Sequence, residues 1–406
     1  MKIGFVSATF RTDLEKWVNG IYKRMGTFIE ATKDLGELDM LFYVDGHIPI
    51  SNSYVAEVEE HLSDRWRARL KLTLCHLAPS RPANGRWQYY ISPALSIYNH
   101  PHYSRTAGKE QVLAFNRMLS RNPDAVFVHR LQSMIPILLS GEKLPPIFFD
   151  LDDIEHIVFL RNLKQPPWWP LKCLTYLQAP ILLLWERKAI LQSSKTFVCS
   201  ENDQKYLSKI WRLRNVVTVP NAVDIPEERE LPDTPTLLFL GSFSYPANIL
   251  GADYLITKIW PTILSAMPEA RLIIAGAHPE NIPSFQYNPE GVEFTGFVES
   301  LDELYKQVRV VCCPILSGGG TRIKILEAAA YGKPVVSTTI GAEGLHFCNG
   351  QEILLGDDPA SFADACIQLL KDERFATHIG IRARSVVVRS YEKAKIVREI
   401  QEHFIF

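Results

Sequence analysis

The sequence predicts an α/β protein with two doubly wound domains, each built on a parallel sheet. At 406 residues the chain is too long for one ordinary hydrophobic core. Short apolar strand patterns alternate with helix patterns in both halves, and the charged, proline-rich segment Pro226–Pro235 interrupts the alternation as a linker would. We therefore expect an N-terminal domain over residues 1–228 and a C-terminal domain over residues 229–389. The helix at about 390–406 is a candidate to pack back on the first domain.

Composition excludes several classes of protein. Hydrophobic residues make up 47% and charged residues 22%, as in soluble globular proteins, and the net charge of −1 provides no basic field for nucleic acid. The seven cysteines follow no metal-ligand spacing, and Cys312-Cys313 lies inside an apolar strand pattern, which favours reduced thiols and a cytoplasmic protein. The N-terminal stretch indicates a strand rather than a signal peptide, and no apolar run approaches about 18 residues.

The N-terminal half begins with a buried strand pattern and continues with alternating elements. Predicted strands are Lys2–Ala8, Leu41–Val44, Asp124–His129, Ile147–Asp150, Thr196–Ser200 and Val216–Val219. Predicted helices are Leu14–Leu35, Leu171–Gln192 and Glu201–Trp211. Residues 50–120 show no clear period, and the aromatic stretch 86–103 fits a sugar platform or a packing cluster equally well. The tryptophans of Pro166–Pro170 (PPWWP) could touch a membrane surface, but we predict that they are buried between domains.

The C-terminal half repeats the same alternation. Predicted strands are Leu237–Leu240, Arg271–Ala275, Val292–Phe294, Val310–Leu316 and Pro334–Thr339. Predicted helices, besides the one that follows Gly320, are Ile249–Met267, Leu301–Gln307, Ala360–Lys371, Arg374–Ser390 and Tyr391–Phe404.

The stretch from Val310 to Leu345 organises the rest of the chain. A strand runs into the glycine turn 318–320, a helix pattern follows, and a second strand closes one βαβ unit. Thr321 is the predicted N-cap of this helix, and Gly332 stands where a C-terminal cap residue belongs. A helix N-terminus attracts anions, and glycines let an anion approach the backbone closely.

Three charged side chains at this turn indicate which ligand groups it could bind. Arg322 and Lys324 carry the positive charge that a diphosphate requires, and Glu327 offers a carboxylate for a pair of sugar hydroxyls. The loop could therefore hold a diphosphate while Glu327 holds a ribose. The alternative is a tight turn before a surface helix, with Lys324 and Glu327 in an ordinary exposed ion pair.

A second candidate site follows the strand that ends at Asp150. Asp150, Asp152, Asp153 and His156 crowd at the carboxyl end of a predicted parallel strand, the edge where doubly wound sheets carry their active sites. His156 is the preferred acid–base or orienting group. Asp152 and Asp153 fit either a helix cap with an acidic first turn or the ligands of a divalent metal ion.

Two nucleotide motifs are absent from the sequence. No G-x-G-x-x-G follows the first strand, which argues against a nicotinamide-dinucleotide enzyme, and no G-x-x-x-x-G-K-[ST] supports a P-loop NTPase. Gly20, early in the first predicted helix, fits either a ligand approach or simple packing.

The segment GGGTRIKILEAAAYGKPVVSTTIGAEGL closely resembles the nucleotide-sugar-binding stretch of retaining glycosyltransferases of family 4. FLGSFSYPANILGADYL, RLIIAGAHP and VEFTGFVES resemble further elements of that family's C-terminal domain, and IFFDLDDIEH and VPNAVD resemble two strand ends of its N-terminal domain. The resemblance implies the B-type glycosyltransferase fold, in which two Rossmann-like domains face each other across a cleft.

The resemblance also implies an activity and its residues. The family moves a hexose from a UDP- or GDP-linked sugar to a hydroxyl of a saccharide or glycolipid, with retention and without a metal or other cofactor. Lys324, with Arg322, would neutralise the diphosphate and Glu327 would hold the ribose, while Asp153 and His156 are the catalytic candidates of the first domain. The remaining donor-binding candidates are Gly20, Gly241, Ser242, Phe297, Val298, Gly319, Gly320, Thr321, Gly344 and Leu345.

One position departs from the family pattern. Many members have a second glutamate eight residues before Glu327, where this chain has Gly319, although other members also have glycine there. The alternatives are a nucleotide-sugar epimerase or phosphorylase of the same fold, or a non-catalytic binding protein with a vestigial cleft. By analogy with the family, we expect the protein to act in polysaccharide or glycolipid assembly, with peripheral contact at the inner face of a membrane.

Overall fold

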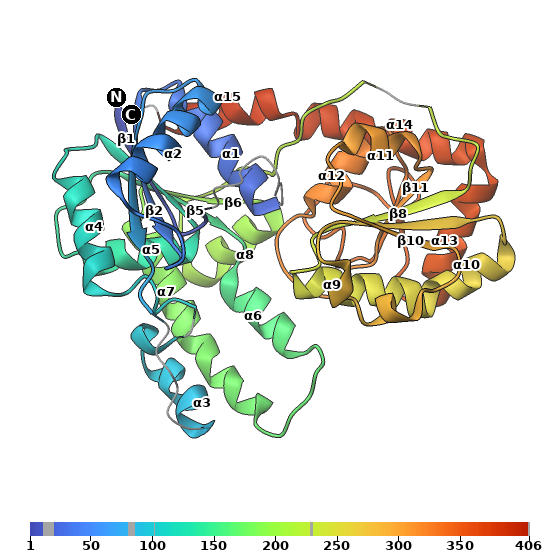
Figure 1. Cartoon of the computed structure of the whole chain (residues 1–406), viewed down its shortest axis with the longest axis horizontal. Coiled ribbons are helices and arrows are strands. Elements are labelled where there is room, and N and C mark those ends of the chain that lie inside the picture. The colour runs from blue at the N-terminus through green and yellow to red at the C-terminus, as the bar shows by residue number, and fades with distance from the viewer. Residues whose placement is uncertain (11–19, 80–85, 101, 228–229, 405–406) are drawn as a thin grey trace. The chain divides into compact units, whose positions relative to one another are not determined.

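The computed structural model describes residues 1–10, 20–79, 86–100, 102–227 and 230–404. They form two compact units (Figure 1). Counting described residues only, the first unit holds residues 1–10, 25–219 and 397–404, and the second holds residues 20–24 and 220–396. The division therefore falls between Val219 and Pro220, and again inside the last helix, between Ile396 and Val397.

The first unit is built on a seven-stranded parallel sheet of order β3-β2-β1-β4-β5-β6-β7. Its strands are β1 Lys2–Ser7, β2 Glu37–Val44, β3 Leu70–His76, β4 Ala125–His129, β5 Ile147–Asp152, β6 Lys195–Val198 and β7 Val216–Thr218. Every residue of β4 and β5 is buried. Central strands of a parallel sheet are covered on both faces, which explains their apolar sequences. The predicted α/β class is confirmed.

Helices of the first unit include several that the sequence pattern did not reveal. They are α1 Gly20–Lys33, α2 Asn52–Trp66, α3 Arg86–Leu95, α4 Lys109–Leu119, α5 Arg130–Leu139, α6 Glu155–Leu163, α7 Ala179–Gln192, α8 Glu201–Trp211 and α15 Lys393–His403. Residues 20–24 of α1 group with the second unit. The ring of Phe404, just after α15, stacks on Phe148 of β5 with centroids 4.1 Å apart, so the last residues pack on the first unit.

The segment after α6 corrects two predictions. Leu171–Gln192 is not one α-helix, because a 3₁₀ stretch, η2 Lys172–Gln178, precedes α7. Pro180 lies in the first turn of α7, where a missing N–H costs no hydrogen bond, so this proline is compatible with the start of the helix. Trp168 and Trp169 are 67% and 41% exposed, and the prediction that they are buried is wrong.

The second unit contains a six-stranded sheet of order β10-β9-β8-β11-β12-β13. Its strands are β8 Thr236–Leu240, β9 Arg271–Ala275, β10 Val292–Gly296, β11 Val310–Cys313, β12 Val335–Ser337 and β13 Leu354–Leu355. Numbered within the unit, this is the order 3-2-1-4-5-6, which reverses direction between β8 and β11. Loops at the carboxyl ends of the strands on either side of such a switch point form the usual binding site of this architecture.

Helices lie on both sides of this sheet (Figure 1). They are α9 Pro246–Tyr254, α10 Trp260–Ala266, α11 Leu301–Lys306, α12 Ile323–Ala330, α13 Pro359–Lys371 and α14 Glu373–Ser390. A single π-helical turn, Leu255–Ile259, joins α9 to α10, so the predicted helix Ile249–Met267 is continuous but locally underwound into a wider turn. In the described part of the chain, no helix combines the length and the apolar character that crossing a bilayer requires.

Candidate functional site

The candidate site lies at the switch point of the second unit. The loop after β8 begins at Gly241, and the loop after β11 contains the glycine turn and leads into α12. The helices that follow these loops are in contact, because the Nζ atom of Lys324 in α12 donates a hydrogen bond to Oδ1 of Asn248 in α9 at 2.9 Å. Two segments about 75 residues apart in the chain thus build one site at the predicted edge of the sheet.

The glycine turn has a conformation that few other residues adopt. Gly318 and Gly320 have φ angles of 111° and 63°. A Cβ atom on Gly318 would lie 3.0 Å from Nη2 of Arg322 and 3.2 Å from the hydroxyl of Tyr245. Glycine at 318 therefore allows the Arg322 guanidinium to lie directly against the loop.

Arg322 holds the loop in this shape. Its Nη1 donates to the carbonyl oxygens of Gly319 and, at 3.4 Å, of Gly320, while Nη2 donates to that of Ser317 at 3.4 Å. Its buried Nε has no hydrogen-bond partner among the described residues. The guanidinium thus stabilises the conformation of the turn through hydrogen bonds to its backbone carbonyls. Its contact with a diphosphate stays a prediction.

Thr321 does not cap α12, so that prediction is wrong. The N-cap residue is Arg322, without a side-chain cap bond. The hydroxyl of Thr321 instead accepts a hydrogen bond from Nδ2 of buried Asn221 at 2.8 Å, and Oδ1 of Asn221 accepts one from Arg24 at 3.3 Å. The predicted end of the helix is confirmed, because Gly332 follows the C-cap with a φ of 69°.

Lys324 is a half-buried cation. Its ammonium lies 4.4 Å from the ring centroid of Phe239, and no carboxylate pairs with it in the described part of the chain. Burial lowers the pKa of Lys324 to about 8, the Cys313 thiol opposes this, and the neighbouring charge of Arg322 adds to it. A cation held by an amide and an aromatic face, rather than by an acid, is available to an anionic ligand.

The loop after β8 requires glycine beside this cation. A Cβ on Gly241 would lie 2.9 Å from Nζ of Lys324 and 2.8 Å from Nδ2 of Asn248. That same Nδ2 donates to the carbonyl of Ser242 at 2.9 Å. Gly241 and Ser242 thus lie beside Lys324 and Asn248, and their contact with a donor stays a prediction. Asn248 was not predicted, although it lies inside a motif that suggested the family.

Glu327 pairs with Lys23 rather than with Lys324. The two side chains form an ion pair with 12% and 22% of their side-chain surface exposed, and the exposed Lys324–Glu327 pair considered as an alternative is absent. Burial lowers the pKa of Lys23 to about 8, against the attraction of Asp224. Gly20, one turn earlier in α1, lies close to α12, since a Cβ there would lie 3.5 Å from Cδ1 of Ile323.

The other predicted donor residues lie on two further loops. Gly344 has a φ of 77°, and Leu345 packs against a hydrophobic cluster that includes Ile323 and Leu326 of α12. Phe297 is 44% exposed and Val298 packs on the core. Both follow β10, the edge strand, which β9 separates from β8.

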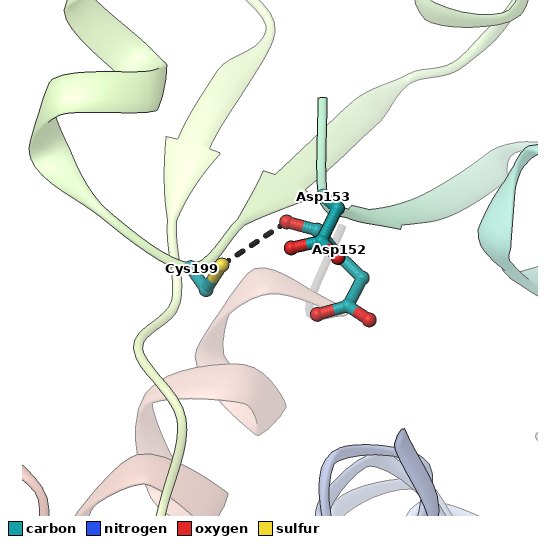
Figure 2. Close-up of side chains that lie close together, drawn as sticks. All are labelled: Asp152, Asp153 and Cys199. Carbon is teal, nitrogen blue, oxygen red and sulfur yellow. Dashed lines mark hydrogen bonds between the residues drawn. The ribbon is translucent and has the colours of Figure 1, made fainter. Parts of the chain in front are cut away.

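The acidic cluster of the first unit lies at the end of β5 (Figure 2). Asp152, Asp153 and Cys199 each bring a potential ligand atom within 4.8 Å of the others. The Cys199 thiol, however, donates to the backbone carbonyl of Asp152 at 3.0 Å, and Nε of Arg130 lies 3.9 Å from the Asp152 carboxylate. Arg130 therefore supplies positive charge here. The helix-cap interpretation is wrong, because the N-cap residue of α6 is Ile154.

His156 is buried with both ring nitrogens engaged. Nδ1 bonds to the carboxylate of Glu186, and Nε2 bonds to the hydroxyl of Tyr206 at 2.9 Å. Burial raises the pKa of Glu186, which the hydrogen bond to His156 opposes. Of the two roles expected for His156, this geometry favours orienting its neighbours over proton exchange with a substrate.

Replacing His156 with phenylalanine is therefore expected to destabilise the fold by about 3 kcal/mol, because the buried carboxylate of Glu186 loses its side-chain partner and keeps the backbone N–H of Glu155. Urea unfolding measures the loss, and Tyr206→Phe is the matched control, since it removes only the hydroxyl at Nε2. An unchanged unfolding midpoint together with a large fall in turnover would instead show an acid–base role.

The second unit contains a segment that matches a known protein family. Residues 234–372 match the model of the family described as glycosyl transferases group 1. The match lies within the second unit. The chain is 26% identical over 172 residues to an uncharacterized 44.6 kDa protein in the cps region of Klebsiella pneumoniae, covering 40% of this chain and 44% of that protein.

A second curated relative is the phosphatidyl-myo-inositol mannosyltransferase of Mycobacterium leprae, 24% identical over 211 residues, which cover 48% of this chain and 55% of that protein. The chain thus spans about half the length of the curated relatives it matches.

Solved structures resemble the chain over its whole length. Sucrose-phosphate synthase from Thermosynechococcus elongatus has a TM-score of 0.69 at 16% identity, covering 99% of this chain and 98% of that one. TarM of S. aureus has a TM-score of 0.70 at 12% identity, covering 100% of both chains. Anabaena HepE has a TM-score of 0.67 at 13% identity, covering 99% of both chains. The two-domain B-type glycosyltransferase fold is confirmed.

Proposed function

We propose that the chain is a retaining glycosyltransferase that moves a hexose from a UDP- or GDP-linked sugar to a hydroxyl of a saccharide or glycolipid. The observation that carries this proposal is Lys324, a cation without a carboxylate partner among the described residues, placed beside a glycine turn at the switch point of the unit that matches the group 1 glycosyltransferase model. Anabaena HepE was crystallised with UDP-glucose, and the Mycobacterium leprae relative is named for phosphatidyl-myo-inositol.

The charges at the glycine turn suit a departing diphosphate. When the bond between the sugar and the diphosphate breaks, negative charge accumulates on the β-phosphate. Lys324, Arg322 and the positive end of α12 would stabilise that charge. In this proposal the side chains do the work of a metal ion, and no metal or other cofactor takes part.

The remaining donor contacts follow from the same placement. Glu327 would accept hydrogen bonds from the ribose hydroxyls, and the backbone at Gly319, Gly320 and Gly344 would lie along the phosphates and the sugar. The acceptor hydroxyl would attack an oxocarbenium-like centre from the face that the diphosphate leaves, so the configuration of the sugar is retained.

A donor screen tests this proposal. The protein is incubated with UDP- and GDP-linked hexoses, with and without a saccharide acceptor, and nucleotide release is followed in buffer containing EDTA. We expect one donor to be consumed, EDTA to leave the rate unchanged, and NMR of the product to show the anomeric configuration of the donor. An inverted product or loss of the rate in EDTA would contradict the mechanism, and an epimerised donor without acceptor would identify an epimerase instead.

A further inference from the structure

Asn248 connects the loop after β8 to the cation of α12. It is the third residue of α9 and is half-buried. Its Nδ2 donates a hydrogen bond to the carbonyl of Ser242 at 2.9 Å, while its Oδ1 accepts one from Nζ of Lys324 at 2.9 Å. One amide therefore links a backbone carbonyl on one side to an ammonium on the other.

These two contacts fix the orientation of the Asn248 amide. If the amide were reversed, its NH₂ group would face the ammonium, donor against donor, and its oxygen would face the Ser242 carbonyl, acceptor against acceptor. The amide also lies directly against the backbone at Gly241, where a Cβ would come within 2.8 Å of Nδ2. The amide oxygen is thus held toward Lys324.

The other groups around Lys324 do not replace this acceptor. The ring centroid of Phe239 in β8 lies 4.4 Å from the ammonium, and the titratable groups that act on it are the thiol of Cys313 in β11 and the guanidinium of Arg322. The Arg322 charge disfavours a second cation beside it. Burial raises the pKa of Cys313, so its thiol supplies no compensating negative charge near neutral pH. Among the described residues, Asn248 is therefore the group that accepts a hydrogen bond from the ammonium.

An amide acceptor suits a cation that has to bind an anion. A lysine ammonium carries three N–H donors, and the hydrogen bond to Asn248 uses one of them, which leaves the others to a ligand. A carboxylate in the same place would neutralise the charge and compete with a diphosphate, whereas an apolar side chain would leave the half-buried charge without an acceptor. An amide oxygen stabilises the charged form and leaves the net charge of the ammonium intact.

We propose that Asn248 is a positioning residue for transfer: its amide holds the Lys324 ammonium in place at the switch point and keeps it charged without neutralising it. Asn248 itself contacts no reacting atom and acts only through Lys324. The part that Asn248 plays in transfer rests on the proposed function, whereas its effect on the ammonium does not. One measurement on the protein alone and one on the reaction therefore separate the two.

Titration of the lysine tests the effect on the ammonium. The full chain is labelled with lysine enriched in the NMR-active carbon isotope at Cε, and the Lys324 signal, identified by its loss in Lys324→Met, is followed against pH. Burial lowers the pKa of Lys324 to about 8 in the wild type. Asn248→Leu, which keeps the branched shape and removes both polar atoms, should lower the midpoint by about one pH unit. Asn248→Asp should raise the midpoint, since an opposite charge favours the ammonium.

The pH profile of kcat/KM tests the part played in transfer, with the donor that the screen identifies. In Asn248→Leu the fall of kcat/KM with rising pH should move to lower pH, so that the loss is about tenfold at alkaline pH and small at acid pH. In Asn248→Asp kcat/KM should fall about tenfold or more wherever Lys324 is charged, because the carboxylate competes with the diphosphate. Calorimetric titration of this variant with UDP and GDP should show the same weakening.

Asn281→Asp is the matched control. Nδ2 of Asn281 donates to the carbonyl of Phe243 in the same loop at 3.0 Å, so the variant makes the same chemical change at a hydrogen bond that does not involve Lys324. Its lysine titration and its pH profile should match those of the wild type.

Unchanged Lys324 midpoints in both Asn248 variants would overturn the proposal. A kcat/KM that falls equally at all pH values, without a shift of the profile, would also overturn it and leave Asn248 a purely structural role. If the wild type consumes no donor, the proposed function fails, while the lysine titration and the binding of UDP and GDP still decide the role of Asn248 at the ammonium.

Discussion

Replacing Lys324 with alanine is expected to lower kcat about 100- to 1,000-fold, the range found when a charge-stabilising group is removed from an active site. The ammonium stands free of any carboxylate in the described chain, with Asn248 and the ring of Phe239 as its neighbours. Its attraction for the diphosphate grows as negative charge develops there, so the loss should fall on kcat more than on KM.

Nucleotide release with saturating donor measures this change, and calorimetric titration with the nucleotide separates binding from chemistry. Lys258→Ala, which removes an exposed lysine of the same unit, controls for the loss of one cation, and thermal unfolding checks the fold. Because the pKa of Lys324 is lowered to about 8, its charge is present below pH 8 and lost above, so wild-type kcat/KM should fall as the pH rises through that value. Near-normal turnover in the variant would exclude Lys324 from catalysis.

Much of the fold follows from the sequence because parallel strands are buried on both faces. Strands such as β4 and β11 are continuous apolar runs with every residue buried, so their pattern is unmistakable. Strand β3 was missed because it is an edge strand, where Lys71 is exposed between buried Leu70 and Leu72. The end of α2 is also hard to predict, because basic residues alternate through positions 65, 67, 69 and 71 while the helix ends at Arg67, which has a φ of 48°.

The candidate site, too, could be predicted only in part from the sequence. The glycine turn, Lys324 and Glu327 were predictable because a strand, a turn and a helix start carry their signal within about 20 residues. Their partners were not, because Asn248 and Lys23 come from elements that only the folded chain brings to α12. The local sequence makes Thr321 a good helix N-cap. In the folded chain, however, its hydroxyl accepts a hydrogen bond from Asn221, which lies 100 residues earlier.

Glu327 is the residue from which we expect the second large effect. If its carboxylate accepts two hydrogen bonds from ribose hydroxyls, each about 1.5–3 kcal/mol as for charged groups, Glu327→Ala should lower kcat/KM for the nucleotide sugar at least 100-fold. The ion pair with Lys23 shows that the carboxylate is already held in position in the second turn of α12. This binding energy is present in both the ground state and the transition state, so its loss in the variant should appear mainly as a higher KM.

A deoxy donor makes the test specific for the ribose. Wild-type enzyme should lose much of its kcat/KM when a ribose hydroxyl is removed from the donor, whereas Glu327→Ala should lose little more, because the contact is already gone. Lys23→Met is the matched control: it breaks the same ion pair but keeps the carboxylate, so it should still discriminate between the two donors. Undiminished discrimination in Glu327→Ala would place the ribose elsewhere and leave Glu327 as a partner of Lys23 alone.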